Sequence, residues 1–384
     1  MMKFLVIALL IVNLAAYAQD STKSPSPVTG GIYDRPYLLR PSSQLAIGGY
    51  AEAMFRSEYE DGIHENSSFE ARRFNLFVHS AFAERIRLTA ELEFEHGTEE
   101  IKLEMAIVDV EVYDELNLRG GILLSPLGKF NISHDSPRNE FNDRPLVSTL
   151  IIPSTLSEAG FGLFGSFYPG DQVLTYEAYL VNGLTDGVIL AGEGTSIPDG
   201  RPVAFEEDNN GSPAIVGRVA FRPGFGGEIG VSGHTGAYNT FTVDGIEVDE
   251  KRQLTIVAID GEFRVGDLAV QGEFAHAKVG IPPSLVGLYA EAQQGFYAQA
   301  VYTIFDGFME MFPRSTLSAG VRFDHVNLDT EIDGALTRRV TVGLNLRLVP
   351  ETALKLDYQH SWNFDRLNNE SRAAVVQFGF ATYF

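Results

Sequence analysis

The 384-residue sequence contains no cysteine and carries little positive charge. The absence of cysteine excludes disulfide frameworks, thiolate catalysis and cysteine-ligated zinc. Lys and Arg number 29 against 51 Asp and Glu, which gives a formal net charge of −22. Nucleic-acid binding needs a basic footprint that this composition does not supply. Apolar residues are nevertheless 45% of the chain and aromatic residues 11%, so the sequence indicates a chain that packs or meets lipid rather than a disordered polyanion.

The first residues predict an exported protein. Residues 1–18 combine Lys3, the apolar run 4–12 and a small-residue cleavage site at 16–18, which together are typical of a secretory signal peptide. The apolar run is well short of the roughly 20 residues that a membrane-spanning helix needs. Residues 19–44 are rich in Pro, Ser and charge, and we interpret them as a periplasmic arm.

Apolar and polar residues alternate with a period of two through most of the remaining chain. Near the C-terminus, for example, Leu354, Leu356 and Tyr358 oppose Lys355, Asp357 and Gln359. Segments of roughly ten residues with this pattern are typical of transmembrane β-barrels. Sixteen such strands are predicted, at 45–57, 68–82, 85–96, 101–113, 115–124, 159–168, 172–183, 213–222, 226–235, 251–264, 267–277, 289–304, 315–325, 336–348, 351–362 and 371–384.

The connections between these strands fall into two kinds. Those after even-numbered strands are mostly tight turns with Gly or Pro, except for 305–314, whereas those after odd-numbered strands tend to be long and polar. Single-chain outer-membrane barrels have short periplasmic turns and long external loops. Since lipid offers no hydrogen-bond partners, the strands must also close on themselves. The sequence therefore predicts an all-β, closed antiparallel transmembrane barrel over 45–384.

The segment 125–158 differs from the other long connections because it contains a run of apolar residues, 146–152. A simple surface loop does not need them, and a sixteen-stranded barrel is wide enough to receive a loop in its interior. Folded inward, the segment would narrow the lumen and set a charge field across it, as charged rings do in selective pores. The residues expected at this constriction are Lys129, His134, Asp135, Arg138, Glu140, Asp143 and Arg144. An outward loop or a latch between subunits remains the alternative.

Strand alternation also assigns charged side chains to the inner wall. The basic ones are Arg85, Arg87, Arg119, Arg322, Arg339, Arg347 and Lys355. Acidic residues face the lumen as well, namely Glu91, Glu93, Glu95, Glu104, Glu177, Asp324 and Asp357. Anion preference is therefore a hypothesis, with Arg138 and Arg144 as the candidate anion contacts because guanidinium groups match phosphate and carboxylate geometry.

The loop after the fifth strand resembles the constriction loop of sixteen-stranded general porins. The stretch from GGILLSPLGKFN through DRPLV to IIPSTLSEAGFGLFG, about Gly120 to Gly165, looks like the phosphate-selective porin O and P family. This resemblance implies a trimeric, water-filled outer-membrane channel whose phosphate selectivity depends on a lumen lined by arginine and lysine. That ladder has no residue-by-residue match here. The last strand, which ends at Phe384, looks like the signal read by the barrel-assembly machinery, although Thr382 departs from it.

The sequence thus predicts a passive diffusion channel for small hydrophilic solutes, with no enzymatic chemistry and no cofactor. The eight His residues form no H-x-x-x-H pair, so no metal site is expected. The expected partners are outer-membrane lipid, small solutes or anions, and copies of the chain in a homotrimer. An outer-membrane enzyme or adhesin with a plugged lumen is the alternative.

Overall fold

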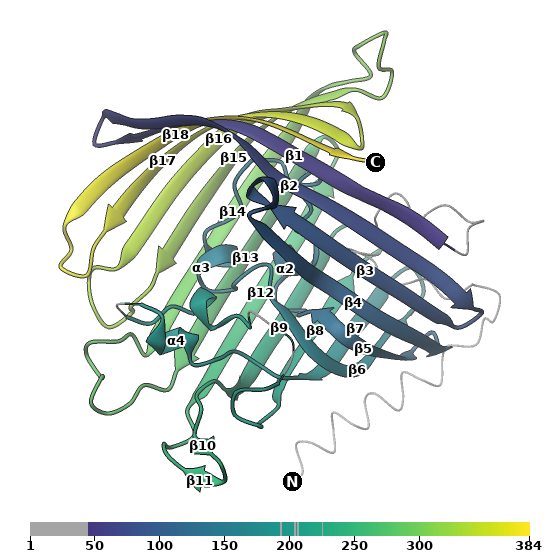
Figure 1. Ribbon diagram of the computed structural model, residues 1–384. Coiled ribbons are helices and arrows are strands. Elements are labelled where there is room, and N and C mark those ends of the chain that lie inside the picture. Colours follow the sequence, from purple (N-terminus) through teal and green to yellow (C-terminus); the bar gives the residue numbers. More distant parts are fainter. Residues whose placement is uncertain (1–44, 193, 203–204, 206, 225) are drawn as a thin grey trace.

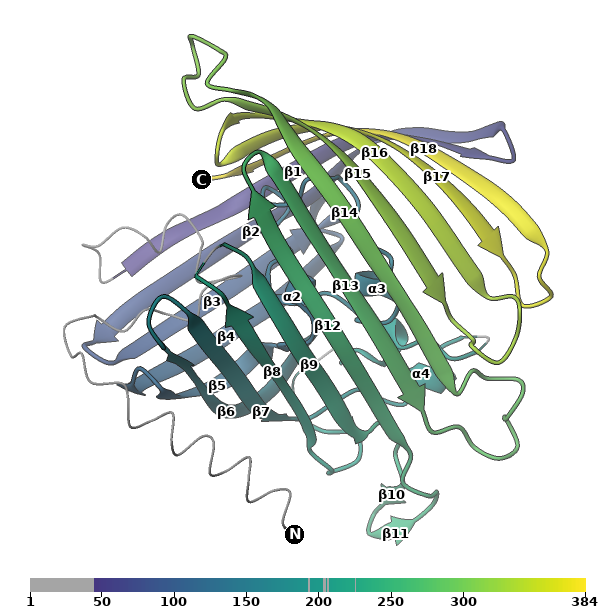
Figure 2. The same cartoon turned by 180° about the vertical axis from the view of Figure 1, so that it is seen from behind.

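In the computed structural model, the described residues are 45–384 without 193, 203–204, 206 and 225. The predicted signal peptide at 1–18 and arm at 19–44 lie outside the described residues. The described chain forms a closed antiparallel barrel in which β1 pairs with β18 (Figures 1 and 2). The predicted all-β barrel of sixteen strands is therefore confirmed. The barrel strands are β1 (Leu45–Glu60), β2 (Ile63–Ala83), β3 (Ile86–Glu95), β4 (Glu100–Tyr113), β5 (Leu116–Leu124), β6 (Ser157–Phe167), β7 (Val173–Val181), β8 (Ala214–Arg222), β9 (Glu228–Ala237), β12 (Gln253–Val265), β13 (Leu268–Val279), β14 (Ala292–Asp306), β15 (Thr316–Asn327), β16 (Leu336–Val349), β17 (Thr352–Phe364) and β18 (Glu370–Tyr383).

Few residues of the described chain are helical. Three α-helices and two 3-10 helices lie in the connections: α2 (Lys129–Ile132), α3 (Val147–Leu150), α4 (Gly187–Leu190), η4 (His96–Thr98) and η5 (Pro198–Gly200). A two-stranded ribbon, β10 (Thr242–Val243) and β11 (Ile246–Glu247), lies in the connection between β9 and β12. Within the described ranges, no helix is long and apolar enough to cross a membrane.

The outer face of the barrel is apolar. Val321, Val342, Tyr358 and Val376 are register partners across β15 to β18 and are 39–47% exposed. Large apolar residues are exposed all round the other strands too, for example Val257 and Ile259 on β12. Contiguous apolar exposure on this scale marks a surface that another apolar phase covers. In a closed barrel, that is the face that lipid would contact.

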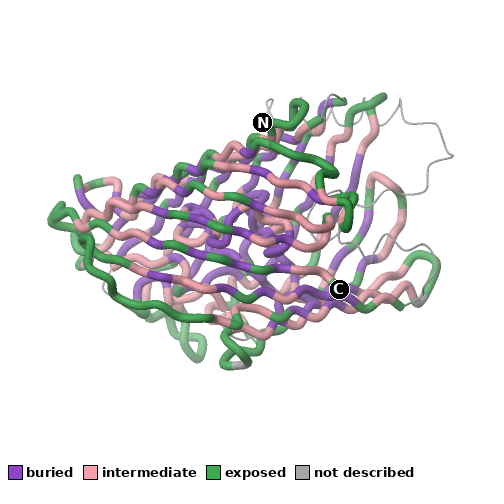
Figure 3. The backbone as a smooth tube through the Cα atoms, turned by 90° about the horizontal axis from the view of Figure 1, so that it is seen from above, coloured by how far each residue is buried: buried purple, intermediate pink, exposed green. Residues whose placement is uncertain are grey.

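The inner face carries the alternate residues and is largely polar in the half of the wall built from β1 to β4 and β15 to β18. Arg322, Asp324, Arg339, Lys355 and Asp357 are all buried there. Seen from above, buried and exposed positions alternate along the strands, and buried chain also occupies the interior (Figure 3). This half of the barrel therefore has the inverse of a soluble protein's arrangement, with polar residues inside and apolar ones outside.

The strands depart from their predicted bounds mainly at the first hairpin. Only Asp61 and Gly62 separate β1 from β2, so this odd-numbered connection is a tight turn and not a long loop. Both residues have positive φ, 46° and 84°, which is typical of tight hairpin turns rich in Asp and Gly. The residues that follow this turn are mostly polar, so the side-chain pattern does not show where β2 begins.

Candidate pore constriction

The connection between β5 and β6, residues 125–156, lies inside the barrel and carries α2 and α3 (Figures 1 and 2). Asn131 ties the two ends of this loop together. Its Nδ2 donates to the carbonyls of Ser125 (2.7 Å) and Leu156 (3.1 Å), and its Oδ1 accepts from the Leu156 N–H (2.8 Å). Because Asn131 is fully buried, these bonds fix the base of the loop where it leaves the wall.

Asp143 anchors the far part of the loop to three strands. Its carboxylate accepts hydrogen bonds from Arg56 on β1 (3.1 Å), Arg72 on β2 (3.1 Å) and Gln377 on β18 (2.7 Å). Burial raises the pKa of Asp143, but the guanidinium groups of Arg72 and Arg56 outweigh burial and hold that pKa well below its ordinary value. Asp143 is therefore charged at neutral pH.

Carboxylates on the wall also hold the loop backbone. Asp357 accepts from the Asn142 N–H (2.5 Å), and Asp324 accepts from the Leu146 N–H (2.8 Å). These side chains satisfy backbone donors that have no strand partner inside the barrel. Wall side chains thus hold the loop at several points along its path across the lumen.

The other side of the loop is held by β9, β12 and β13. Lys129 forms ion pairs with Glu228 (2.9 Å) and Glu262 (3.1 Å). On β13, Glu273 accepts from the Ser148 hydroxyl (2.7 Å) and from the Phe130 N–H (3.1 Å). The loop therefore contacts opposite walls and divides the lumen.

An apolar cluster fills the part of the interior nearest the long loops, and strand alternation did not predict the wall residues that belong to it. Loop residues such as Ile151 and Ile152 pack with inward-facing wall residues such as Val216 and Ile256, and with Val188 from the connection 182–213. All five are fully buried. Strand β12 carries apolar residues on both faces, so alternation alone does not separate this dry region from a wet lumen.

The predicted basic wall residues fall into three groups: some contact the loop, some pair within the wall, and one lies in a turn. Arg119, Arg322, Arg339 and Lys355 are buried and point inward, and the last three donate to loop carbonyls. Arg347 donates to the Pro137 carbonyl (2.6 Å), and Arg87 pairs with Glu111 (2.9 Å). Arg85 does not line the wall: it is exposed in the turn between β2 and β3 and donates to the Val112 carbonyl.

The predicted constriction residues of the loop also lie in several different places. Lys129, Arg138, Glu140 and Asp143 line one cavity, described below. Asp135 is buried and accepts from the Tyr383 hydroxyl (2.8 Å), while His134 is buried against Glu104. Arg144 donates to the Ser154 carbonyl (3.2 Å) and points away from that cavity, toward the acidic residues of β3 and β4. The two candidate anion contacts, Arg138 and Arg144, are therefore not together.

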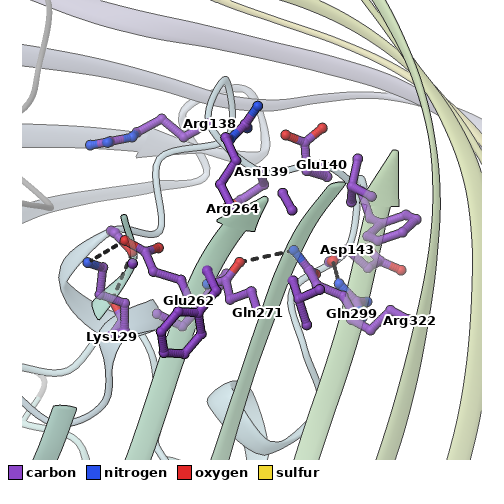
Figure 4. A pocket seen from close by; sticks show the side chains of 18 residues that line it. Lys129, Arg138, Asn139, Glu140, Asp143, Glu262, Arg264, Gln271, Gln299 and Arg322 are labelled. Atoms are coloured by element: carbon purple, nitrogen blue, oxygen red, sulfur yellow. Dashed lines mark hydrogen bonds and ion pairs between the residues drawn. The ribbon is translucent and has the colours of Figure 1, made fainter. Parts of the chain in front are cut away.

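A cavity of about 390 Å³ lies between the loop and the wall of β12 to β15 (Figure 4). Its charged lining residues are Lys129, Arg138, Arg264 and Arg322 against Glu140, Asp143 and Glu262. Gln271 and Gln299, which hydrogen-bond to each other at 3.0 Å, add neutral polar groups. The excess of one cation makes this cavity polar and weakly positive. Arg264, Gln271 and Gln299 were not singled out from the sequence, although two-residue alternation from Glu262 indicates that Arg264 faces inward.

No protein-family model matches the chain. An uncharacterized protein of Aquifex aeolicus (strain VF5) is 25% identical over 371 residues, with 88% of this chain and 80% of that protein covered.

Solved outer-membrane proteins share the fold. An anion-selective porin from Comamonas acidovorans matches with a TM-score of 0.57 and 12% identity, covering 89% of this chain and all of the other. Pseudomonas putida OprB matches with a TM-score of 0.56 and 10% identity (89% and 94% covered). The outer membrane channel DcaP of Acinetobacter baumannii matches with 0.54 and 12% (88% and 97% covered). At these identities the likeness shows the sixteen-stranded porin fold, while membership of the phosphate-selective porin O and P family stays a prediction.

Proposed function

We propose that this chain is an outer-membrane diffusion channel for small hydrophilic solutes, narrowed by loop 125–156. The observation that carries this proposal is the polar cavity of about 390 Å³ between the loop and the wall of β12 to β15. Water and small solutes need such a polar path, whereas the apolar outer face suits contact with lipid. The channel needs no cofactor and no covalent chemistry, because solutes move down their own gradients.

We infer a weak preference for anions. Lys129 and Arg322 are engaged by wall or loop oxygens, whereas Arg264 has no ion pair among the described residues. Arg264 is therefore the guanidinium group best placed to meet a passing carboxylate or phosphate, whose geometry it matches. Arg138 lines the same cavity and adds to its positive charge. The acidic residues Glu140 and Glu262 keep this preference modest.

The experiment is a reversal-potential measurement in planar lipid bilayers with a salt gradient, on the wild type and on the double variant Arg138→Ala, Arg264→Ala. Two unit charges at ~4 Å in water interact by about 1 kcal/mol, so the anion-to-cation permeability ratio should fall several-fold. Arg85→Ala is the matched control, because Arg85 is exposed in a turn outside the cavity. An unchanged ratio in the double variant would remove the assigned role of these two residues.

A second candidate is a barrel with a plugged lumen that serves as an enzyme or adhesin scaffold. The apolar cluster around Ile151, Ile152 and Val188 favours it, because a dry core inside the barrel obstructs the path toward the long loops. Liposome swelling with sugars of graded size separates the two candidates. Entry of small sugars supports the channel, and exclusion of every sugar by correctly folded protein supports the plug.

We further propose that the chain is exported after cleavage of residues 1–18, is inserted by the barrel-assembly machinery and forms a homotrimer. The apolar outer face leaves room for both lipid and subunit contacts, and one solved neighbour, OmpT of Vibrio cholerae, is described in a trimer form. N-terminal sequencing of the protein from outer membranes tests the cleavage, and chemical cross-linking in the membrane tests the trimer.

A further inference from the structure

A cluster of ionisable side chains lies between the loop and the wall of β3 and β4, away from the cavity. Glu91 on β3, Glu104 on β4 and His134 on the loop are 0%, 4% and 1% exposed. One ligand atom from each lies within 4.8 Å of the other two. Acidic groups by themselves are common in a barrel lumen. The burial of two carboxylates together with an imidazole calls for a physical explanation.

The backbone of β4 is irregular where it supplies its carboxylate. Leu103 pairs with Leu92 and Met105 pairs with Glu91, so Glu104 is an extra residue in a β-bulge. As a result, Glu104 and Met105 are both buried, although neighbours on a regular strand would point to opposite faces. Bulges are used to re-aim a side chain next to a functional site, and this one aims Glu104 at His134.

The imidazole of His134 is oriented for metal binding. Its Nδ1 lies 2.8 Å from the Asn131 carbonyl, which accepts only, so Nδ1 carries the proton. In the neutral imidazole, Nε2 then carries the lone pair, and it lies 2.6 Å from Glu104 Oε1. Among the described residues, no hydrogen bond reaches Nε2. A backbone carbonyl that fixes the tautomer in this way is the usual support of a metal-binding histidine.

Further polar and charged side chains surround the three candidate ligands. Asn75 donates to Glu91 (2.7 Å) and to Glu93 (3.2 Å), which holds a third carboxylate beside the other two. The Arg144 guanidinium is close enough to Glu93 and Glu104 to interact with both electrostatically. Glu93 also lies 3.6 Å from the Arg73 guanidinium, so charges of both signs surround the three candidate ligands. The two carboxylates among those ligands, Glu91 and Glu104, match the charge of a divalent cation.

We propose that Glu91, Glu104 and His134 bind a divalent transition-metal cation of the Zn²⁺ type, which fastens the loop to the β3–β4 wall. Imidazole nitrogen and carboxylate oxygen are both ligands for such ions, at roughly 2.0–2.2 Å. Two ligands of one tetrahedral ion are then ~3.4 Å apart. The His134 and Glu104 atoms are closer than this, so they part slightly when the ion enters. The site was invisible to motif spacing, because its three ligands come from two strands and a loop.

The test is metal binding by the mature full-length chain. The protein is stripped with EDTA while unfolded, refolded in detergent with and without Zn²⁺, dialysed to equilibrium and analysed for bound metal by mass spectrometry. We expect one Zn²⁺ per chain in the wild type, and a loss of about 10-fold or more in affinity for the double variant Glu91→Gln, Glu104→Gln. Circular dichroism and the heat-dependent gel mobility of the barrel check that each variant is folded.

The barrel offers a matched control in a second buried His–Glu pair. His234 Nε2 lies 2.9 Å from Glu158 Oε1, with a serine in place of further carboxylates. His234→Asn should leave Zn²⁺ binding unchanged, whereas His134→Asn should abolish it. If the Glu variants fail to fold, the visible absorption of Co²⁺ refolded with the wild type and with His134→Asn decides whether a nitrogen ligand is present.

Three outcomes would overturn the proposal: no Zn²⁺ in the refolded wild type, equal binding in His134→Asn, or a Co²⁺ spectrum identical to that of the aqueous ion. The first would mean that a proton shared between His134 and Glu104 holds the pair. Because metal content is measured without any channel assay, a failure here leaves the proposed channel function untouched, and a silent channel would not count against the metal site.

Discussion

Replacing Asp143 with Asn is expected to release the loop from the wall formed by β1, β2 and β18. The substitution preserves shape but removes the charge that faces Arg56 and Arg72, both at 3.1 Å. The side chains are 11% exposed for Asp143, 30% for Arg56 and 16% for Arg72, so the pairs lie between fully buried and surface. Breaking a buried pair costs about 3–5 kcal/mol and a surface pair contributes about 0–1 kcal/mol. We therefore expect a loss of about 2–4 kcal/mol in the free energy of unfolding.

The assay is guanidinium unfolding of the refolded barrel in lipid vesicles, followed by the fluorescence of its one tryptophan, Trp362. Asp171→Asn is the matched control, because Asp171 is an exposed turn residue. The pKa of Asp143 is lowered in the folded state, so its stabilising effect is present above the ordinary carboxyl pKa of about 3.9 and is lost as pH falls below that value. A stability difference below ~0.5 kcal/mol at pH 7, or one that persists unchanged at pH 3, would refute the assigned anchoring role.

Three further predictions concern the wall. Gly379→Ala adds a Cβ that overlaps the Asn142 amide oxygen, so single-channel conductance should change while barrel assembly does not; identical conductance would contradict the described loop path. Arg119→Ala leaves Asp109, to which Arg119 donates two bonds of 2.7 Å, as a buried unpaired charge, and should cost about 3–5 kcal/mol in guanidinium unfolding. Val257→Arg, on the apolar outer face, should cost about 2–4 kcal/mol in vesicles if lipid covers that face, and no cost would count against a membrane location.

The sequence was sufficient to predict the barrel. Each strand pairs only with its neighbours, and its side chains must alternate between the apolar outer face and the inner face. The run from Leu354 to Gln359 lies in β17 with Leu356 and Tyr358 exposed outward and Lys355 and Asp357 buried inward, as its alternation predicts. The exceptions arise where alternation is absent. The polar residues of 58–67 extend β1 and β2 into a hairpin that side-chain pattern does not reveal.

The interior was less predictable, because its contacts join residues that are far apart in the sequence. The apolar residues of 146–152 indicated that the loop packs against something, but not which wall residues would receive it. The partners of Asp143 come from β1, β2 and β18, and no local pattern encodes such a choice. The apolar lining near Val216 and Ile256 was not predicted either, because a strand that is apolar on both faces shows no two-residue alternation.

The most direct test of the account is the conductance of single wild-type molecules in a planar lipid bilayer. A barrel with an open polar path beside loop 125–156 should give discrete, reproducible current steps, with a reversal potential displaced toward that of the anion. Folded protein that inserts into the bilayer and carries no current would contradict the channel and leave the interior as a plug.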